Sequence, residues 1–261
     1  LSTGIAIEIT GQHIDPDQDA VLCDAGWKKL LNSMTADIIP SQCAGVIVCL
    51  SVDQLKTQLT GHTHAGLQLA RQRINDLMEL ATRRLPVYVM LTHADELDGV
   101  EQLLSHLPAE LLTQPAGALL PYRSALATDY VRRSIDELAR YMPWLALRAT
   151  TQGGRAAQSG LLAARDIRNL QAPLETALMA LFGNSAYHEP PLYRGLFLSG
   201  RSAQTGRAGT TMRSADGGLV FGPGVFEQVL SYDRAFQPLS TYEKLRKQRT
   251  RLAWTGYYAA V

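Results

Sequence analysis

The sequence predicts an α/β fold in which a mostly parallel β-sheet has helices on both faces, with a helical subdomain inserted before the last strand. Two continuous apolar runs, at 44–50 and 87–91, are typical of parallel strands that are covered on both faces. Between them, residues 64–82 carry apolar side chains at helical spacing. Strands that alternate with helices over short links favour parallel pairing.

The first elements of the chain are expected to be a strand and a helix. Gly4 to Ile9 is β-prone, and a polar loop rich in aspartate follows it. From Ala20 to Met34 the apolar side chains recur at helical spacing. Right-handed crossovers bring the carboxyl ends of parallel strands to one edge of the sheet. A ligand is therefore expected beside the residues that come after Ile9, after Leu50 and after Leu91.

The second half of the chain has a different pattern. Residues 99–182 are predicted to be helical throughout, with breaks at prolines, and 192–198 to form one more strand. A glycine-rich loop is expected from Ser199 to about Gly224, followed by a helical end. The predicted organisation is an α/β core at 1–98, a mostly helical subdomain at 99–186, the last core strand and glycine-rich loop at 187–224, and a helical segment at 225–261 that leads into a transmembrane helix.

The composition excludes several classes of protein. Hydrophobic residues make up 46% and charged residues 19% of the chain, which is ordinary for a folded protein and wrong for a disordered one. A formal net charge of +1 gives no overall field that would attract nucleic acid. The cysteines lack metal-ligand spacing, and Cys49, inside an apolar run, is expected to be a buried, reduced thiol.

A candidate ligand motif, Thr92-His93-Ala94-Asp95, follows the second apolar run. Guanine-specific GTPases carry Asn/Thr-Lys-x-Asp after a buried strand, where the aspartate binds the guanine edge and the lysine stem packs over the ring. Thr92 and Asp95 fit that pattern, whereas His93 replaces the lysine. The alternative is that Thr92 and Asp95 cap the next helix, and the sequence favours neither interpretation.

Two other segments occupy positions that nucleotide switches use. Glu8-Ile9-Thr10-Gly11 ends the first predicted strand, where an Asp-x-x-Gly would hold the magnesium shell and the terminal phosphate. Glu8 is one methylene longer than aspartate, so only Gly11 fits. Ser199 and Gly200 follow the last predicted strand, where GTPases place a backbone turn over the base, although a simple turn is the favoured interpretation.

The phosphate-binding sequence G-x-x-x-x-G-K-[ST] does not occur in the chain. It normally precedes the Asp-x-x-Gly strand, so it would lie before Leu1. Because the chain starts without Met and ends in an uncharged run, we expect a fragment of a longer protein. No nucleophile with a partner base and no ligand set at metal spacing is visible, so no catalytic or metal-binding residue is predicted.

Basic residues are concentrated directly before the uncharged run at 252–261. Cationic flanks stay on the cytoplasmic side of membrane helices, so this run is interpreted as the start of a transmembrane helix. It is shorter than the ~20 apolar residues that a span needs, and the alternative is a solvated helix followed by a buried one. The membrane-proximal basic residues are Lys244, Arg246, Lys247, Arg249 and Arg251.

Three segments in the same order resemble the TssM/IcmF family of bacterial secretion systems. Residues 44–55 are similar to the family pattern N-G-V-I-V-x-L-S-x-x-x-L, and residues 84–100 to R-L-P-V-Y-V-L-F-T-K-x-D-x-L-x-G-F. Residues 187–204 resemble Y-x-x-x-P-x-x-R-G-x-Y-F-T-S-G-x-Q. The basic end resembles the family's entry into its third transmembrane segment, so the resemblance covers nearly the whole chain.

The resemblance implies a GTPase-like domain on the cytoplasmic side of the bacterial inner membrane, in a type VI secretion complex. The implied partners are the TssL and TssJ subunits, the cytoplasmic baseplate, the membrane and further copies of the chain. The departures at Glu8 and His93 favour a scaffold that docks partners and needs no cofactor. The alternative is an active NTPase, using GTP or ATP with Mg²⁺, whose phosphate loop lies upstream of Leu1.

Overall fold

The structure is a computed structural model of the chain, and it describes most of the region between residues 20 and 230. The predicted first strand, with Glu8 and Gly11, lies outside the described residues, as does the basic segment that begins at Tyr242. The described ranges are 20–34, 43, 45–57, 61–81, 84–121, 128–148, 154–183, 189–202 and 218–230.

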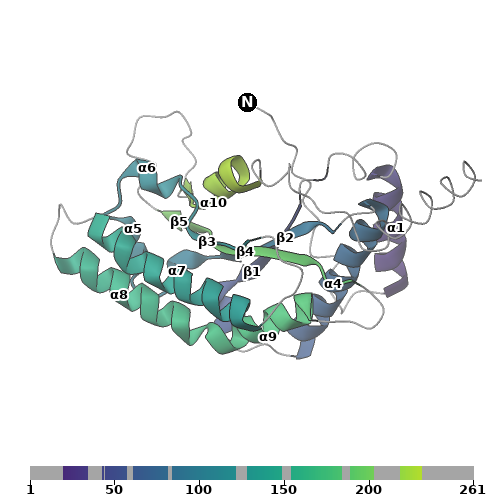
Figure 1. The fold of residues 1–261 in the computed structure, drawn as a ribbon, viewed down its shortest axis with the longest axis horizontal. Helices are drawn as coiled ribbons and strands as arrows, with labels where there is room; N and C mark the ends of the chain where they lie inside the picture. Colours follow the sequence, from purple (N-terminus) through teal and green to yellow (C-terminus); the bar gives the residue numbers. More distant parts are fainter. Residues whose placement is uncertain are drawn as a thin grey trace, which may run out of the picture.

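A mostly parallel sheet lies at the centre of the described residues (Figure 1). Its strands are β1 (Val46–Ser51), β2 (Pro86–Thr92), β3 (Gly117–Leu119) and β4 (Leu192–Leu198). The strand order is β1-β2-β4-β3, with β1, β2 and β4 parallel and β3 antiparallel to β4. Leu50, Leu91 and Leu198 are in register across the parallel strands, so the carboxyl ends of these strands meet at one edge, as the sequence predicts.

The helices predicted at 20–34 and 64–82 are confirmed as α1 and α4. Their apolar side chains at helical spacing belong to the main hydrophobic core, which explains why the sequence pattern was sufficient to find them. The remaining helices are shorter or belong to the inserted segment. The helical elements are α1 (Ala20–Met34), α3 (Val52–Lys56), α4 (Gly61–Ala81), η2 (Ala94–Glu96), α5 (Val100–Leu104), α6 (Ala109–Leu112), α7 (Thr128–Arg148), α8 (Gly154–Asn169), α9 (Gln171–Phe182), α10 (Gly222–Gly224) and η5 (Val225–Leu230).

The two faces of the sheet bury different amounts of apolar surface. Along β2, Val87, Val89 and Leu91 belong to the large core beneath α4, α7, α8 and α9, whereas Tyr88 and Met90 belong to a small cluster with residues of η5. This alternation follows from the two-residue repeat of a strand. Among the described elements, helices therefore cover mainly one face, and the prediction of helices on both faces is met on the second face only by η5.

The sequence predicted helices throughout residues 99–182, but the structure places a short strand among them. Gly117–Leu119 forms β3 and adds an antiparallel edge strand to β4. Glycines make this pairing possible, because a Cβ atom on Gly117 would lie 2.4 Å from the Leu196 carbonyl oxygen and one on Gly195 would lie 2.4 Å from that of Ala118. The helices of this segment share one hydrophobic core with the parallel strands.

The expected glycine-rich loop also contains regular structure. Gly200–Ser202 forms β5, which pairs antiparallel with β6 (Gly218–Val220), and α10 follows directly. The prediction of a loop from Ser199 to Gly224 is therefore wrong at both ends of the segment, while 203–217 lies outside the described residues. The placement of β5 matters for the candidate site, because it starts immediately after β4.

Candidate functional site

The loops that follow β2 and β4 are joined at the carboxyl edge of the sheet. The Ser199 amide donates a hydrogen bond to the Leu91 carbonyl oxygen at 2.8 Å, and the Ala94 amide donates one to the Ser199 carbonyl oxygen at 3.0 Å. These bonds extend the pairing of β2 with β4 beyond the last strand residues. The structure thus brings the Thr92–Asp95 motif and the Ser199-Gly200 turn together, although they are far apart in sequence.

The Asp95 carboxylate closes this joint. Its Oδ1 atom accepts a hydrogen bond from the backbone amide of Arg201 at 2.9 Å. A Cβ atom on Gly200 would lie 2.9 Å from the same oxygen, so only glycine leaves room for the contact. Asp95 is therefore a tie between the two loops, and Gly200 is the residue that lets the tie form.

His93 and Thr92 occupy the turn that leads into η2. His93 is exposed and has left-handed backbone angles, φ 58° and ψ 40°, which histidine tolerates better than most residues. The Thr92 hydroxyl donates a long hydrogen bond, 3.4 Å, to the Leu50 carbonyl oxygen on β1. No side-chain cap hydrogen bond is made at the start of η2, whereas Asp95 and Glu96 lie in its first turn, as the helix-start alternative expects.

A second network lies beside this joint and was not found from the sequence. Lys56, at the end of α3, donates a hydrogen bond to the Glu96 carbonyl oxygen at 2.7 Å and forms an ion pair with Asp166 of α8 at 2.8 Å. The Asp98 amide donates to the same Asp166 oxygen at 3.0 Å. Burial by itself raises the pKa of Asp166, but the bonds from Lys56 and Asp98 outweigh it, so the pKa lies below its ordinary value.

Sequence reasoning missed this network because nothing in the sequence links its members. Its members, Lys56, Asp98 and Asp166, come from three separate segments. The sequence around each is typical of an ordinary exposed charged side chain. The one available signal was the position of Lys56 and Asp98, which follow the carboxyl ends of β1 and β2 closely. The network fixes α8 against the loop that carries Asp95.

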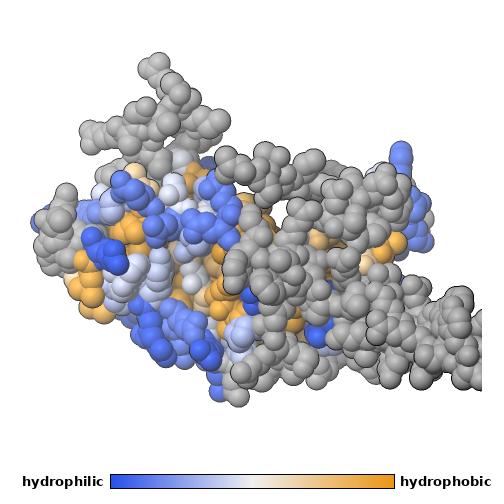
Figure 2. Space-filling view, turned by 45° about the horizontal axis from the view of Figure 1, so that its top comes forward, coloured by the Kyte–Doolittle hydropathy of each residue, from blue (hydrophilic) through white to orange (hydrophobic). Residues whose placement is uncertain are grey.

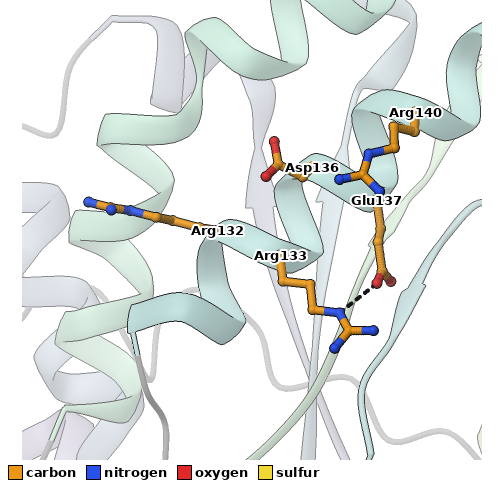
Figure 3. A pocket seen from close by; sticks show the side chains of 5 residues that line it. All are labelled: Arg132, Arg133, Asp136, Glu137 and Arg140. Carbon is orange, nitrogen blue, oxygen red and sulfur yellow. Dashed lines mark hydrogen bonds and ion pairs between the residues drawn. The ribbon is translucent and has the colours of Figure 1, made fainter.

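A hollow of about 410 Å³ lies elsewhere, on the exposed face of α7 (Figure 3). All of its lining side chains come from this single helix, and they are three arginines and two acids. The Arg133 guanidinium donates a hydrogen bond to Glu137 at 2.8 Å across the hollow. A site with mixed charge and walls from one helix is not shaped to hold a nucleotide. The lining residues are Arg132, Arg133, Asp136, Glu137 and Arg140.

The described thiols and acids offer little further chemistry. Cys49 is exposed on β1, contrary to the expected burial, because it lies beside Met90 on the second face of the sheet, which few described side chains cover. Burial raises the pKa of the Cys43 thiol, which makes it a weak nucleophile. Within the described ranges no group of three or more His, Cys, Asp or Glu side chains is placed to hold a metal ion.

The fold and this edge define a mostly parallel α/β domain whose loops after β2 and β4 are tied into one unit. The chain belongs to the IcmF-related N-terminal domain family, which matches residues 24–260. It is 24% identical over 204 residues to the type VI secretion system component TssM1 of Pseudomonas aeruginosa, an alignment that covers 75% of this chain. The chain spans 18% of the length of that relative.

No solved structure matches the chain, so the GTPase-like character of the fold stays a prediction. In the part of the chain that the structure describes, no helix is long and apolar enough to cross a membrane. The predicted nucleotide residues Glu8 and Gly11 lie outside that part, as do the membrane-proximal basic residues Lys244, Arg246, Lys247, Arg249 and Arg251.

Proposed function

We propose that this chain is a scaffold region of a type VI secretion membrane complex, and that it docks partner proteins instead of hydrolysing nucleotide. Membership of the IcmF-related family and the likeness to TssM1 support the assignment to this secretion system. The single observation that favours a scaffold is the Asp95 tie. One oxygen of the carboxylate that a guanine-binding domain would present to the base, Asp95 Oδ1, is occupied by the Arg201 amide.

The cost of reopening this joint can be estimated. A hydrogen bond to a charged group contributes about 1.5–3 kcal/mol, so a base that displaced the Arg201 amide would bind about 10- to 100-fold more weakly. His93 adds to this cost, because its ring is shorter than the lysine stem that packs over guanine. Both effects act in the same direction, and neither depends on residues outside the described ranges.

The proposed setting is the cytoplasmic side of the bacterial inner membrane. The basic residues from Lys244 to Arg251, followed by an uncharged run, support this orientation through the preference of cationic flanks for the cytoplasm. The proposed partners are the TssL and TssJ subunits, the baseplate and further copies of the chain.

The second candidate function is an NTPase that uses GTP or ATP with Mg²⁺. It is favoured by one observation, which is that the Thr92–Asp95 and Ser199-Gly200 loops meet at one edge of the sheet.

Calorimetric titration of the full-length protein with GTP and with ATP, in the presence of Mg²⁺, tests the proposal. We expect no saturable heat up to about 1 mM nucleotide, the weak end of the affinity scale. The matched variants are Asp95→Ala and Glu96→Ala, which remove neighbouring carboxylates. Micromolar binding that Asp95→Ala abolishes and Glu96→Ala preserves would overturn the scaffold proposal in favour of the NTPase.

A further inference from the structure

The consecutive helices α7 and α8 pack tightly against each other. A Cβ atom on Gly160 of α8 would lie 2.5 Å from the Ala146 Cβ and 2.9 Å from the Met142 carbonyl oxygen on α7. Glycine at this crossing therefore lets the two backbones approach closely. Leu147 and Leu161 each follow one of these contact residues in sequence, so their side chains emerge beside the seam between the helices.

Large apolar side chains are exposed on this pair of helices. Leu147 is 65% exposed, Leu161 63% and Trp144 40%. On the side of the molecule that carries α5 to α8 (left in Figure 2), hydrophobic side chains lie beside strongly hydrophilic ones. Isolated exposed leucines need no explanation, but three large apolar side chains on adjoining helices do.

Basic side chains outnumber acidic ones around these apolar residues. The exposed side chains of 138–148 and 154–169 include arginines and no acid, because Asp166 is largely buried and paired with Lys56. Nearby acids are present as well: exposed Asp98 pairs with Arg165 at 3.6 Å, and Asp136 and Glu137 lie beside Arg140. Arg148 lies over the Trp144 ring at 4.7 Å, and Tyr141 stacks on the same ring at 5.2 Å. The arginine face comprises Arg148, Arg155, Arg165 and Arg168 with Trp144, Leu147 and Leu161.

We propose that the arginine face docks an acidic amphipathic helix of a partner protein. Two adjoining helices offer a seam into which the apolar side of a third helix packs. Arginine guanidinium groups bind carboxylates in bidentate fashion, and tryptophan and arginine contribute most binding energy at protein interfaces. A second copy of the chain is disfavoured as the partner, because the arginines of its own arginine face would repel the arginines of the first copy.

This inference deepens the scaffold proposal and rests on it for the need to bind a partner, but it uses none of the residues at the sheet edge. Failure of one is therefore distinguishable from failure of the other. Nucleotide titration reports on Asp95 and its neighbours, whereas occupancy of the arginine face is read at α7 and α8. If the protein binds nucleotide and also docks an acidic helix, the scaffold proposal fails while the docking proposal stands.

Photo-crosslinking in cells tests the docking proposal. A photoreactive phenylalanine analogue replaces Leu147 or Leu161 in the full-length protein, and Met179 on α9, which is 45% exposed, serves as the control position. The crosslinked peptide is identified by mass spectrometry. A second set of proteins carries Arg148→Glu together with Arg165→Glu, and thermal unfolding shows whether this exposed pair of changes leaves the fold intact.

We expect crosslinks from both α7 and α8 positions to one segment that has net negative charge and apolar residues three or four apart. Charge reversal is expected to reduce these crosslinks at least fivefold with the melting temperature unchanged. The proposal is overturned if both positions crosslink to lipid, to another copy of this chain or to a non-acidic segment. Equal crosslinking at Met179, or none at either leucine position, also overturns it.

Discussion

At the scale of single residues, the role of Asp95 decides whether the sheet edge is interpreted as a base-binding site or as two joined loops. Its position after a buried strand suggested a base-binding carboxylate, and its actual partner is the Arg201 amide. Sequence alone could not separate these roles, because both place an aspartate in the segment that follows β2. The difference depends on Gly200, whose missing side chain allows β5 to start within hydrogen-bond distance of Asp95.

The Gly200→Ala variant tests this tie. A methyl group would lie 2.9 Å from Asp95 Oδ1, so the two loops must separate and the carboxylate loses its donor. We expect the free energy of unfolding to fall by about 1–3 kcal/mol. Urea denaturation of the chain provides the measurement. Arg201→Ala is the control, because it keeps the backbone amide and removes only an exposed side chain, and an equal loss in both variants would contradict the tie.

At the scale of elements, the Lys56–Asp166 pair links α3 and α8 to the loop that carries Asp95. The Asp166 side chain is largely shielded from water at 11% exposed, whereas the Lys56 side chain is 32% exposed, and a second hydrogen bond from the Asp98 amide fixes the position of the carboxylate. Shielded pairs with extra hydrogen bonds contribute more than surface pairs do. The helical insertion is therefore held to the sheet by charge as well as by apolar contacts.

Replacing Asp166 with Asn is expected to lower the free energy of unfolding at pH 7 by about 1–3 kcal/mol. The folded pKa of Asp166 is depressed, so its contribution is present above the unfolded value of about 3.9 and is lost as the pH falls through the folded pKa. Denaturation at pH 7 and below pH 4 should show the difference between Asp166→Asn and the parent shrinking with acid. A constant difference would contradict the assignment.

The matched control for that series is Asp98→Asn. The Asp98 side chain is 60% exposed and forms a long ion pair with Arg165 at 3.6 Å. Its backbone amide, which donates a hydrogen bond to Asp166, is unchanged by the substitution. We therefore expect a change within about 0.5 kcal/mol at pH 7.

Long periodic elements were predictable from the sequence, and short paired ones were not. The strand at 192–198 and the helix at 20–34 have the bounds that the apolar pattern indicates, because many residues report on each. Strand β3 has three residues, and its backbone pairing with β4 depends on close approach at Gly117 and Gly195. The hairpin of β5 and β6 likewise depends on contacts between segments that are distant in sequence.

At the scale of the whole molecule, the described residues form one α/β body with a tied sheet edge and a separate basic face. The inserted helices, the parallel strands and α4 share a continuous apolar core. The arginine face on α7 and α8 is on the opposite side of these helices from that core. A scaffold needs this division between a fixed frame and an exposed docking surface.

Hydrogen exchange at the Arg201 amide tests the central claim most directly, because this proton is the one that Asp95 holds. With the full-length protein, protection of this amide should be the same with and without about 1 mM GTP and Mg²⁺, and Asp95→Ala should abolish it. A change in the Arg201 exchange rate on addition of nucleotide would show that the base reaches Asp95, and would contradict the account.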